Sequence, residues 1–270
     1  MIRRPPRSTQ SRSSAASDVY KRQILGGTGS GKSTLLQHVN ALLKPQHGMI
    51  TVDGIDLTQP DLDVKMLRRR VGYAFQTPEE YFFEQYVGDE VAYKAKRYGV
   101  KDKNALREEV ALALAKVGLD FELYKDRLTF GLSGGERRKV ALASVFILNP
   151  AVIVLDEPTA GLDPFSQKEL LCQLHQFIKE GKTLLFATHA MEDAAYLADT
   201  CTVMKDGRQV TSGKVEEVLT DEYALIRGEL LPPLTTQLIK RLNNQGWEIP
   251  QSIIREDELI QAIIHLAVDK

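Results

Sequence analysis

Residues 132–164 read LSGGERRKVALASVFILNPAVIVLDEPTAGLDP, and this stretch decides the fold. A short turn with two glycines opens an apolar segment that Asn149 and Pro150 end, which is the pattern of a buried helix. The β-branched run AVIVL that follows suits a strand buried on both faces, as in a parallel sheet. It delivers Asp156 and Glu157 at its carboxyl end, where open α/β sheets bind ligands. Two adjacent acids can also simply begin a turn, so the rest of the chain decides between a site and a turn.

Composition and charge narrow the classes of protein. The chain has 270 residues, of which 43% are hydrophobic, so it can bury one large core or two modest ones. Its formal net charge of -1 argues against a surface built for nucleic acid. No apolar run approaches the roughly 18 to 20 residues of a membrane-spanning helix, so at a membrane a partner must hold the chain. Cys172 and Cys201 have no metal-ligand spacing, which predicts free thiols in a reducing cytosol.

The first residues differ in character from the rest. Residues 1–23, MIRRPPRSTQSRSSAASDVYKRQ, are rich in Arg, Ser and Pro and show no apolar periodicity. Such a segment cannot bury enough surface to order itself, so we expect a disordered leader that is foreign to the native protein. A transit peptide is the alternative, but the amphipathic face of such peptides is missing. We expect the native chain to start near Gln23 or Ile24.

A glycine-rich loop follows directly. Gly26, Gly31, Lys32 and Ser33 fit the pattern G-x-x-x-x-G-K-[ST] within ILGGTGSGKSTLLQHVNALLKP, residues 24–45. Apolar residues precede the glycines as in a strand and follow them at helical spacing. The glycines allow backbone N–H groups to turn inward and form an anion nest at a helix N-terminus. In such a loop Lys32 reaches the β- and γ-phosphates and the Ser33 hydroxyl binds Mg²⁺.

Polar residues also follow two other predicted strands. Gln76 comes after the aromatic segment 71–75, and His189 comes after the apolar segment 184–187. Either is most often a structural residue, but beside a phosphate loop His189 also fits a γ-phosphate sensor. The aromatic cluster at 81–86 fits either a core or a docking surface.

In their order along residues 24–218, these motifs resemble those of the ABC-type ATPases. The correspondence runs through Walker A at 26–34, a Q-loop at Gln76, the signature LSGGE at 132–136, Walker B at 152–157, a D-loop at 161–163 and an H-loop at His189. The signature is the most specific element, because P-loop GTPases and kinases lack it. The wording of residues 26–45, the sequence FQTPE at 75–79 and the tail that begins GELLPPLTTQLIKRL look like the ATPase subunits of energy-coupling factor (ECF) transporters.

The resemblance implies a fold and a division of the chain. The fold is α/β: a P-loop NTPase core, an α-helical subdomain at about 78–137, a partial antiparallel β subdomain and a short C-terminal extension. The ATP-binding domain is expected at 24–218. The extension at 219–270 is either a dimerisation region or a small packed appendage.

The resemblance also implies an ATP hydrolase that uses Mg²⁺. Glu157 is expected to act as general base, with His189 and Gln76 completing the catalytic set, and Ser33, Gln76 and Asp156 are expected at the metal. The residues expected to bind ATP are Gly26, Gly27, Thr28, Gly29, Ser30, Gly31, Lys32, Ser33 and Thr34, together with Ser133, Gly134 and Gly135. The last three are expected to close on the γ-phosphate held by a second subunit, so a lone chain should hydrolyse ATP poorly.

The implied partners are a second ABC ATPase subunit, identical or different, a transmembrane coupling subunit and a substrate-binding membrane subunit, without nucleic acid. The implied location is the cytoplasmic face of the cell membrane, as a peripheral subunit that drives uptake of a vitamin or a transition-metal ion. The alternatives are another class of ABC transporter or a soluble ABC ATPase of DNA repair or translation. The latter fits less well, since the chain carries one cassette and no long coiled-coil insertion.

One feature departs from the family pattern. An aromatic residue upstream of Walker A stacks on adenine in the family, whereas here only Tyr20 of the leader precedes Gly26, and it is too close to replace that residue. We therefore expect ATP binding to be at least about tenfold weaker than in a chain with the opening strands restored, and equal affinities in an ATP titration would contradict this.

Overall fold

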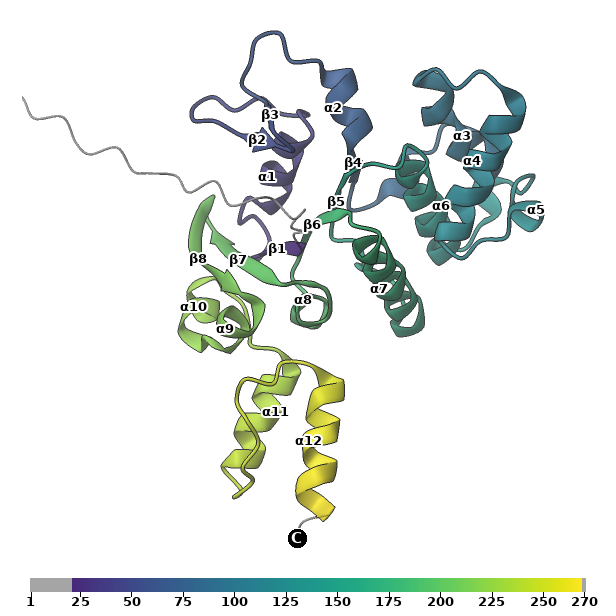
Figure 1. Cartoon of the computed structure of the whole chain (residues 1–270). Helices are drawn as coiled ribbons and strands as arrows, with labels where there is room; N and C mark the ends of the chain where they lie inside the picture. Colours follow the sequence, from purple (N-terminus) through teal and green to yellow (C-terminus); the bar gives the residue numbers. More distant parts are fainter. Residues whose placement is uncertain (1–20, 269–270) are drawn as a thin grey trace, which may run out of the picture.

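The computed structural model describes residues 21–268, and its centre is a six-stranded sheet (Figure 1). The strand order is β4-β5-β6-β1-β7-β8, and all neighbours are parallel except the antiparallel pair β7-β8. The strands are β1 (Lys21–Leu25), β4 (Val71–Ala74), β5 (Val152–Asp156), β6 (Thr183–Thr188), β7 (Thr200–Lys205) and β8 (Arg208–Lys214). This arrangement confirms the predicted α/β fold.

Both faces of the sheet are buried, because neighbouring residues of β5 enter different apolar clusters. Val152 and Val154 pack in a cluster with residues of α1 (Lys32–Val39) and α2 (Val64–Arg70). Ile153 and Leu155 belong to the larger cluster on the other face. Strands covered on both faces need an unbroken apolar run, which is what the sequence provides. The helices of the second face include α6 (Gly134–Phe146), α7 (Pro164–Lys179) and α8 (Met191–Leu197).

The start of β1 corrects the expected boundary of the leader. Lys21 pairs with Leu184 of β6, and Arg22 pairs with both Leu185 of β6 and Thr200 of β7. Residues 21–23 therefore belong to the sheet, and the expectation that they are disordered is wrong. Backbone hydrogen bonds to a neighbour on either side hold these polar residues in a strand, despite their low apolar content. Residues 1–20 of the expected leader lie outside the described residues.

A group of helices lies beyond the β4 edge of the sheet (Figure 1). It contains α3 (Val87–Arg97), α4 (Lys103–Lys116), α5 (Phe121–Tyr124), the short 3-10 helices η1 (Pro78–Tyr81) and η2 (Thr129–Gly131), and it packs on α6. The buried residues of α3 and α4 continue the larger apolar cluster of the sheet. This group covers the expected helical subdomain, whose boundaries stay a prediction.

A small hairpin stands near α1. Its strands β2 (Thr51–Val52) and β3 (Ile55–Asp56) pair antiparallel, and Asp53 and Gly54 in the turn both have positive φ. Asp-Gly turns favour such hairpins because glycine accepts positive φ without strain. Each strand has only 2 residues, which agrees with the predicted partial antiparallel subdomain.

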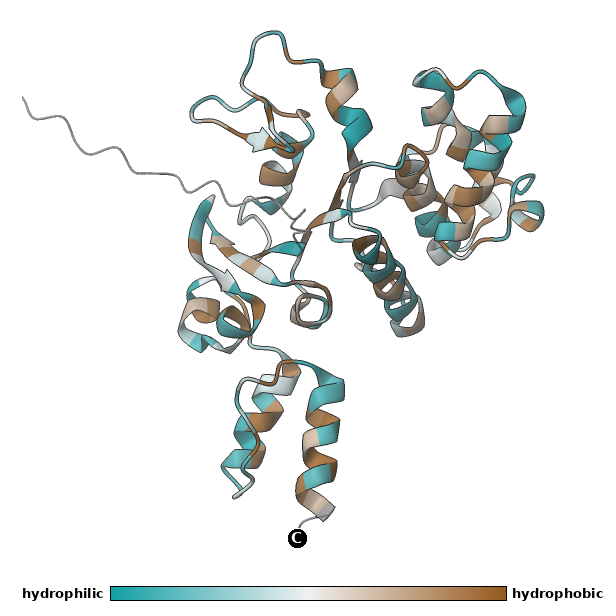
Figure 2. Cartoon of the chain, viewed as in Figure 1, coloured by the Kyte–Doolittle hydropathy of each residue, from teal (hydrophilic) through white to brown (hydrophobic). Residues whose placement is uncertain are grey.

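The last helices form two small units. α9 (Val215–Thr220) and α10 (Glu222–Arg227) pack against β7 and β8, whereas α11 (Leu234–Asn243) and α12 (Glu256–Val268) pack on each other around Ile239, Ile249 and Leu259. The apolar residues of both later helices are visible in Figure 2. Between residues 21 and 268, the structure contains no helix with the length and apolar character needed to cross a bilayer.

Candidate active site

The loop 26–31 joins the end of β1 to the start of α1 and is closely packed. A Cβ atom added at Gly26 would lie 2.4 Å from Ser30 Oγ and 2.5 Å from Met204 O, so glycine is required there. Gly31 caps α1 with φ of 97° and without a side-chain hydrogen bond, and the first turn carries no acidic residue. The N–H groups and the positive end of this helix are therefore left for an anion.

Lys32 lies across the mouth of this loop. Its Nζ donates to the carbonyl oxygens of Gly26 at 2.8 Å and Gly27 at 3.0 Å, and it lies 3.8 Å from Oε1 of Glu157. The side chain is buried. An ammonium group in this place can exchange the two carbonyls for phosphate oxygens when a triphosphate fills the loop. The remaining expected binding residues, Thr28, Gly29, Ser33 and Thr34, are exposed along the loop and the first turn of α1.

Asp156 ends β5 beside this loop and is buried. The Ser33 hydroxyl is hydrogen-bonded to its carboxylate, and Oδ1 has no hydrogen-bond partner among the described residues. Burial raises the pKa of Asp156, and the Ser33 hydrogen bond acts in the opposite direction. A buried carboxylate oxygen without a partner, next to a serine hydroxyl, fits the hard oxygen donors that Mg²⁺ takes from proteins. Within residues 21–268, His, Cys, Asp and Glu side chains do not gather in groups of three or more that could hold a metal ion.

Glu157 and His189 meet at the same edge. Nδ1 of His189 donates to Oε2 of Glu157 at 2.9 Å, and the backbone N–H of Glu157 donates to Ala187 O at 2.9 Å. Glu157 has φ of 48°, an uncommon conformation for a residue other than glycine. Such backbone strain of about 1–3 kcal/mol persists only where the surroundings fix it, and it concentrates at functional sites. The His189 side chain is 67% exposed, which leaves its other ring nitrogen open to a ligand.

Three adjacent strands bring these side chains together. β1 leads into the loop with Lys32 and Ser33, β5 delivers Asp156 and Glu157, and β6 leads to His189. Gln76 lies beyond β4, the next strand along the sheet, and its side chain is exposed. Its main-chain carbonyl accepts a hydrogen bond from Arg138. Within the described residues, no hydrogen bond joins the side-chain amide of Gln76 to Asp156 or Ser33.

The glycine turn at 133–135 stands apart from this cluster. α6 begins there and packs on β4, α3 and α4, whereas α1 packs on β5 and β6. Ser133 Oγ accepts a hydrogen bond from the Glu136 N–H, and the Glu136 carboxylate accepts one from the Ser133 N–H at 2.8 Å. The pKa of Glu136 is lowered to about 2 by this backbone hydrogen bond and by Tyr124. The turn is thus held by a capping box, and its first two residues are exposed.

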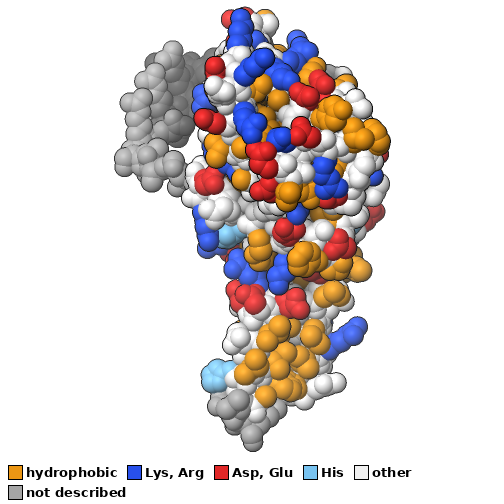
Figure 3. Space-filling view, turned by 90° about the vertical axis from the view of Figure 1, so that its right-hand side faces the viewer, with side chains coloured by type: hydrophobic (Ala, Val, Ile, Leu, Met, Phe, Trp, Pro, Cys, Tyr) orange, Lys and Arg blue, Asp and Glu red, His pale blue; other side chains and the backbone are white. Residues whose placement is uncertain are grey.

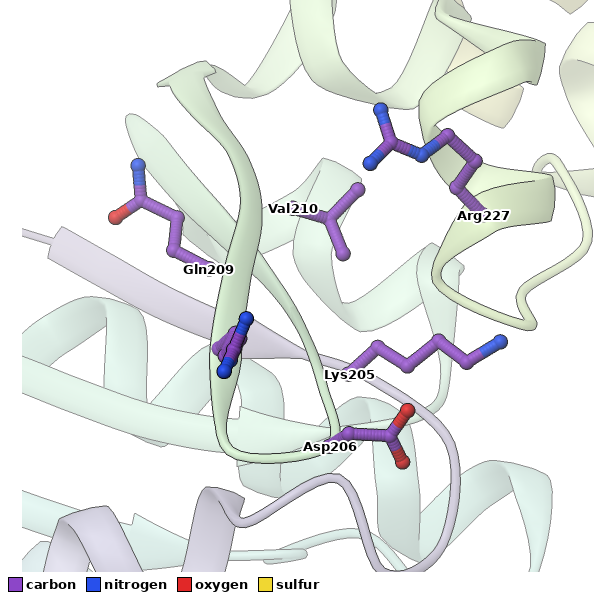
Figure 4. Close-up of a pocket in the computed structure, with 6 residues that line it drawn as sticks. Lys205, Asp206, Gln209, Val210 and Arg227 are labelled. Carbon is purple, nitrogen blue, oxygen red and sulfur yellow. The ribbon is translucent and has the colours of Figure 1, made fainter.

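An open pocket of about 630 Å³ borders the phosphate loop without containing any predicted site residue (Figure 4). The β7-β8 turn connects the pocket region to the loop, because the Gly207 N–H donates to Ser30 O at 3.0 Å. Lys205 is one of its lining cations, and it pairs with Glu229 at 2.9 Å. The pocket therefore lies beside the candidate site, whose predicted residues gather at the strand ends instead.

Sequence reasoning missed three buried polar residues around the site: Arg138, Thr159 and Asp193. Arg138 lies three residues before Ala141 on the buried face of α6, and this helical spacing could have predicted that Arg138 is buried. Thr159 and Asp193 gave no comparable signal, because their contact joins positions far apart in the sequence.

The comparisons with known proteins agree with this geometry. Residues 17–160 match the family described as ABC transporter. The energy-coupling factor transporter ATP-binding protein EcfA2 of Clostridium perfringens is 38% identical over 244 residues, 90% of this chain and 85% of its own. EcfA2 of Symbiobacterium thermophilum is 41% identical over 240 residues, covering 89% and 83%.

Two solved structures share the fold. One is cbiO1 of Clostridium perfringens, described as part of the ABC transporter complex cbiONQ, with TM-score 0.69, 33% identity and coverage of 84% of this chain and 86% of that one. The other is the ATP-binding cassette MJ0796, a dimer bound to ADP and Pi, with TM-score 0.65, 27% identity and coverage of 73% and 86%. The chain therefore belongs to the ABC transporter family and, within it, to the group of energy-coupling factor transporter ATP-binding proteins.

Proposed function

We propose that this chain hydrolyses ATP as one of two ATPase subunits of an ECF-type importer and drives uptake of a vitamin or a transition-metal ion. The observation that carries the proposal is the meeting of Lys32, Asp156, Glu157 and His189 at one edge of the sheet. The names of the relatives support the ECF type, and cbiO1 is itself described as part of a transporter complex. The chain then lies at the cytoplasmic face of the membrane, held there by its partners.

Nucleotide binding follows from the loop and helix α1. The triphosphate fills the nest of backbone N–H groups at 26–34, and Lys32 turns from the two carbonyls to the β- and γ-phosphate oxygens. Ser33 and Asp156, which lie close together, would hold Mg²⁺ with Gln76 when the metal is bound. When bound, Mg²⁺ neutralises charge on the phosphate oxygens during transfer.

Glu157 takes the proton from the attacking water. Its carboxylate is held between Lys32 and His189, at 3.8 Å and 2.9 Å, so one oxygen stays close to the phosphate loop. His189 orients this carboxylate through Nδ1 and presents its exposed edge to the γ-phosphate. Catalysis here consists mainly of positioning and charge stabilisation.

A second subunit completes the site. The turn of Ser133, Gly134 and Gly135, exposed at its first two residues, leads into helix α6, which packs on β4, α3 and α4. N–H groups at such a helix start bind anions, so the turn is suited to the γ-phosphate of a facing subunit. The dimeric state of MJ0796 supports this arrangement.

An aromatic groove offers a place for the transmembrane coupling subunit. The groove has a volume of about 300 Å³ and lies between the end of β4, η1, α3 and α6. Tyr81 and Phe83 are exposed on its rim, whereas Phe82 packs against the core. An apolar helix of a membrane protein fits such a groove.

The C-terminal extension carries a second candidate contact between ATPase subunits. Exposed apolar side chains gather on α11 and α12 and the segment before them, and Figure 3 shows an orange patch on this part. They are Leu231, Leu234, Leu238, Ile260 and Ile264. A contiguous apolar patch of this kind marks an interaction surface more often than a simple packed appendage.

Replacing Glu157 with Gln tests the proposed chemistry. The variant keeps the shape of the side chain but removes the base, so we expect hydrolysis to fall by about 10²–10⁴-fold while ATP binding is unchanged. Steady-state hydrolysis and ATP titration measure the two effects. Glu248→Gln, at an exposed position of the C-terminal extension, is the matched control and should keep full activity. Unchanged hydrolysis in Glu157→Gln removes Glu157 from the mechanism.

A further inference from the structure

The loop that follows Glu157 is held in place by two buried charged side chains. This loop runs through two tight turns, in which the Ala160 N–H donates to Glu157 O and the Leu162 N–H donates to Thr159 O, both at 3.2 Å. It ends at Asp163, which caps α7. The loop therefore connects the proposed base to the D-loop.

The first buried charge is Asp193 on α8, the helix that starts directly after His189. Asp193 is 1% exposed, and its carboxylate accepts hydrogen bonds from Thr159 Oγ1 and, at 2.7 Å, from Gln167 Nε2 of α7. Burial raises the pKa of Asp193, and the two hydrogen bonds act in the opposite direction. The carboxylate thus connects Thr159, in the middle of the loop, to α8, the helix that follows His189.

The second buried charge is Arg138 on α6, which holds the next residue of the loop from another side. One guanidinium nitrogen donates to Ala160 O at 3.0 Å, and another donates to Gln76 O. Arg138 is 5% exposed. A planar guanidinium can hold two carbonyls in a fixed relation, which a lysine cannot do.

Stability alone does not explain these two charges. Burying a carboxylate or a guanidinium costs several kcal/mol in desolvation, and well-packed apolar side chains of similar volume often stabilise a fold as well or better. Glu157, two residues before Thr159, has a positive φ of 48° that the surrounding structure must impose. Holding the adjacent residues 159 and 160 from two helices supplies that constraint.

We propose that Asp193 and Arg138 are positioning residues that fix the Glu157 carboxylate by pinning its loop at Thr159 and Ala160. Arg138 also links this loop to the backbone of Gln76. Both residues act through Glu157. The inference rests on the role of Glu157 given under Proposed function.

The first test replaces Thr159 with Val in the full chain. Valine keeps the shape of threonine but removes the hydroxyl that donates to Asp193. We expect kcat to fall by about ten- to a hundredfold, because small misplacements of a reacting group have effects of this size, while KM for ATP stays unchanged. Thr159→Ser retains the hydroxyl and should restore most of kcat. A folded Thr159→Val chain with normal kcat, or one whose activity serine does not restore, overturns the proposal.

The second test asks whether both charges act through one loop. Arg138→Lys cannot hold both carbonyls, and its effect on kcat should be less than additive with that of Thr159→Val. Full additivity contradicts a shared loop, and if Thr159→Val folds poorly, normal kcat in Arg138→Lys alone overturns the proposal. Lys139→Met is the control, because it breaks the 2.7 Å pair with Glu169 between α6 and α7 but leaves the loop untouched, so kcat should not change.

The failure of this inference can be told apart from the failure of the proposed function. If Glu157→Gln is inactive and Thr159→Val is normal, only this inference fails; if Glu157→Gln is active, the proposed function fails first.

Discussion

Asp156 and Glu157 are neighbours in the sequence, but their side chains have different surroundings. Asp156 Oδ1 is buried, has no hydrogen-bond partner within residues 21–268 and lies next to the Ser33 hydroxyl, whereas both Glu157 oxygens lie near a cation or a histidine. A buried oxygen without a partner suits a metal site, and an oriented carboxylate suits a base. Under the proposed function, the two acids have separate tasks although they share one strand end.

Replacing Asp156 with Asn should stabilise the nucleotide-free chain and abolish turnover. Because burial raises the pKa of Asp156 above 3.8, the folded chain holds that proton more tightly than the unfolded chain does. The free energy of unfolding therefore falls as the pH rises through the window just above 3.8, and at pH 7 the buried charge costs stability. Asn carries no charge, so the thermal midpoint at pH 7 without Mg²⁺ should rise by a few degrees.

The pH dependence separates this account from a packing effect. The difference in midpoint between Asp156→Asn and the unmodified chain should shrink as the pH falls below the ordinary value of 3.8, where both forms are neutral. Mg²⁺ with ATP should stabilise the unmodified chain and not the variant. A lower midpoint for Asp156→Asn at pH 7 contradicts the assignment of Asp156 as a costly buried charge kept for the metal.

At the scale of elements, the sequence predicted the strands and loops whose signals are local. The apolar run of β5 and the glycine loop before α1 each follow from residues close together in the chain. The start of β1 was missed because its polar residues are held by pairing with β6 and β7, which are distant in sequence. The contact between Thr159 and Asp193 was missed for the same reason.

The aromatic groove gives a prediction at this scale. Phe83 is 77% exposed on the groove rim, and its N–H donates to Glu90 at 2.9 Å, so the loop stays in place when the ring is removed. Phe83→Ala should weaken binding to the transmembrane coupling subunit by about tenfold or more, as truncation of a central aromatic contact does. Co-purification of the complex measures the loss, and hydrolysis by the chain alone should not change.

The matched control for the groove is an equally exposed apolar residue outside it. Leu123 on α5 is 72% exposed and does not line the groove. Leu123→Ala should leave the complex intact. If Phe83→Ala binds the membrane partner as well as Leu123→Ala does, the groove is not the docking place.

At the scale of the whole molecule, the proposed function gives each chain two half-sites. The phosphate loop, Asp156, Glu157 and His189 form one half, and the exposed turn at 133–135 forms the other, on a helix that does not pack with α1. A two-fold arrangement of two such chains brings each half against its complement, as isologous dimers do. The whole-molecule claim is that the catalytic site is shared between two subunits.

Mixing two inactive variants tests that claim most directly. Lys32→Ala disables the phosphate loop and keeps the turn, and Ser133→Arg blocks the turn and keeps the loop, so each chain alone should show no hydrolysis. In a mixed pair, one site combines the intact loop with the intact turn, so random pairing should restore about a quarter of the activity of the unmodified chain. Restored hydrolysis in the mixture is the result that we predict. Two folded variants that stay inactive when mixed, while the unmodified chain hydrolyses ATP in proportion to its concentration, would show that each site is complete within one chain and would contradict the account.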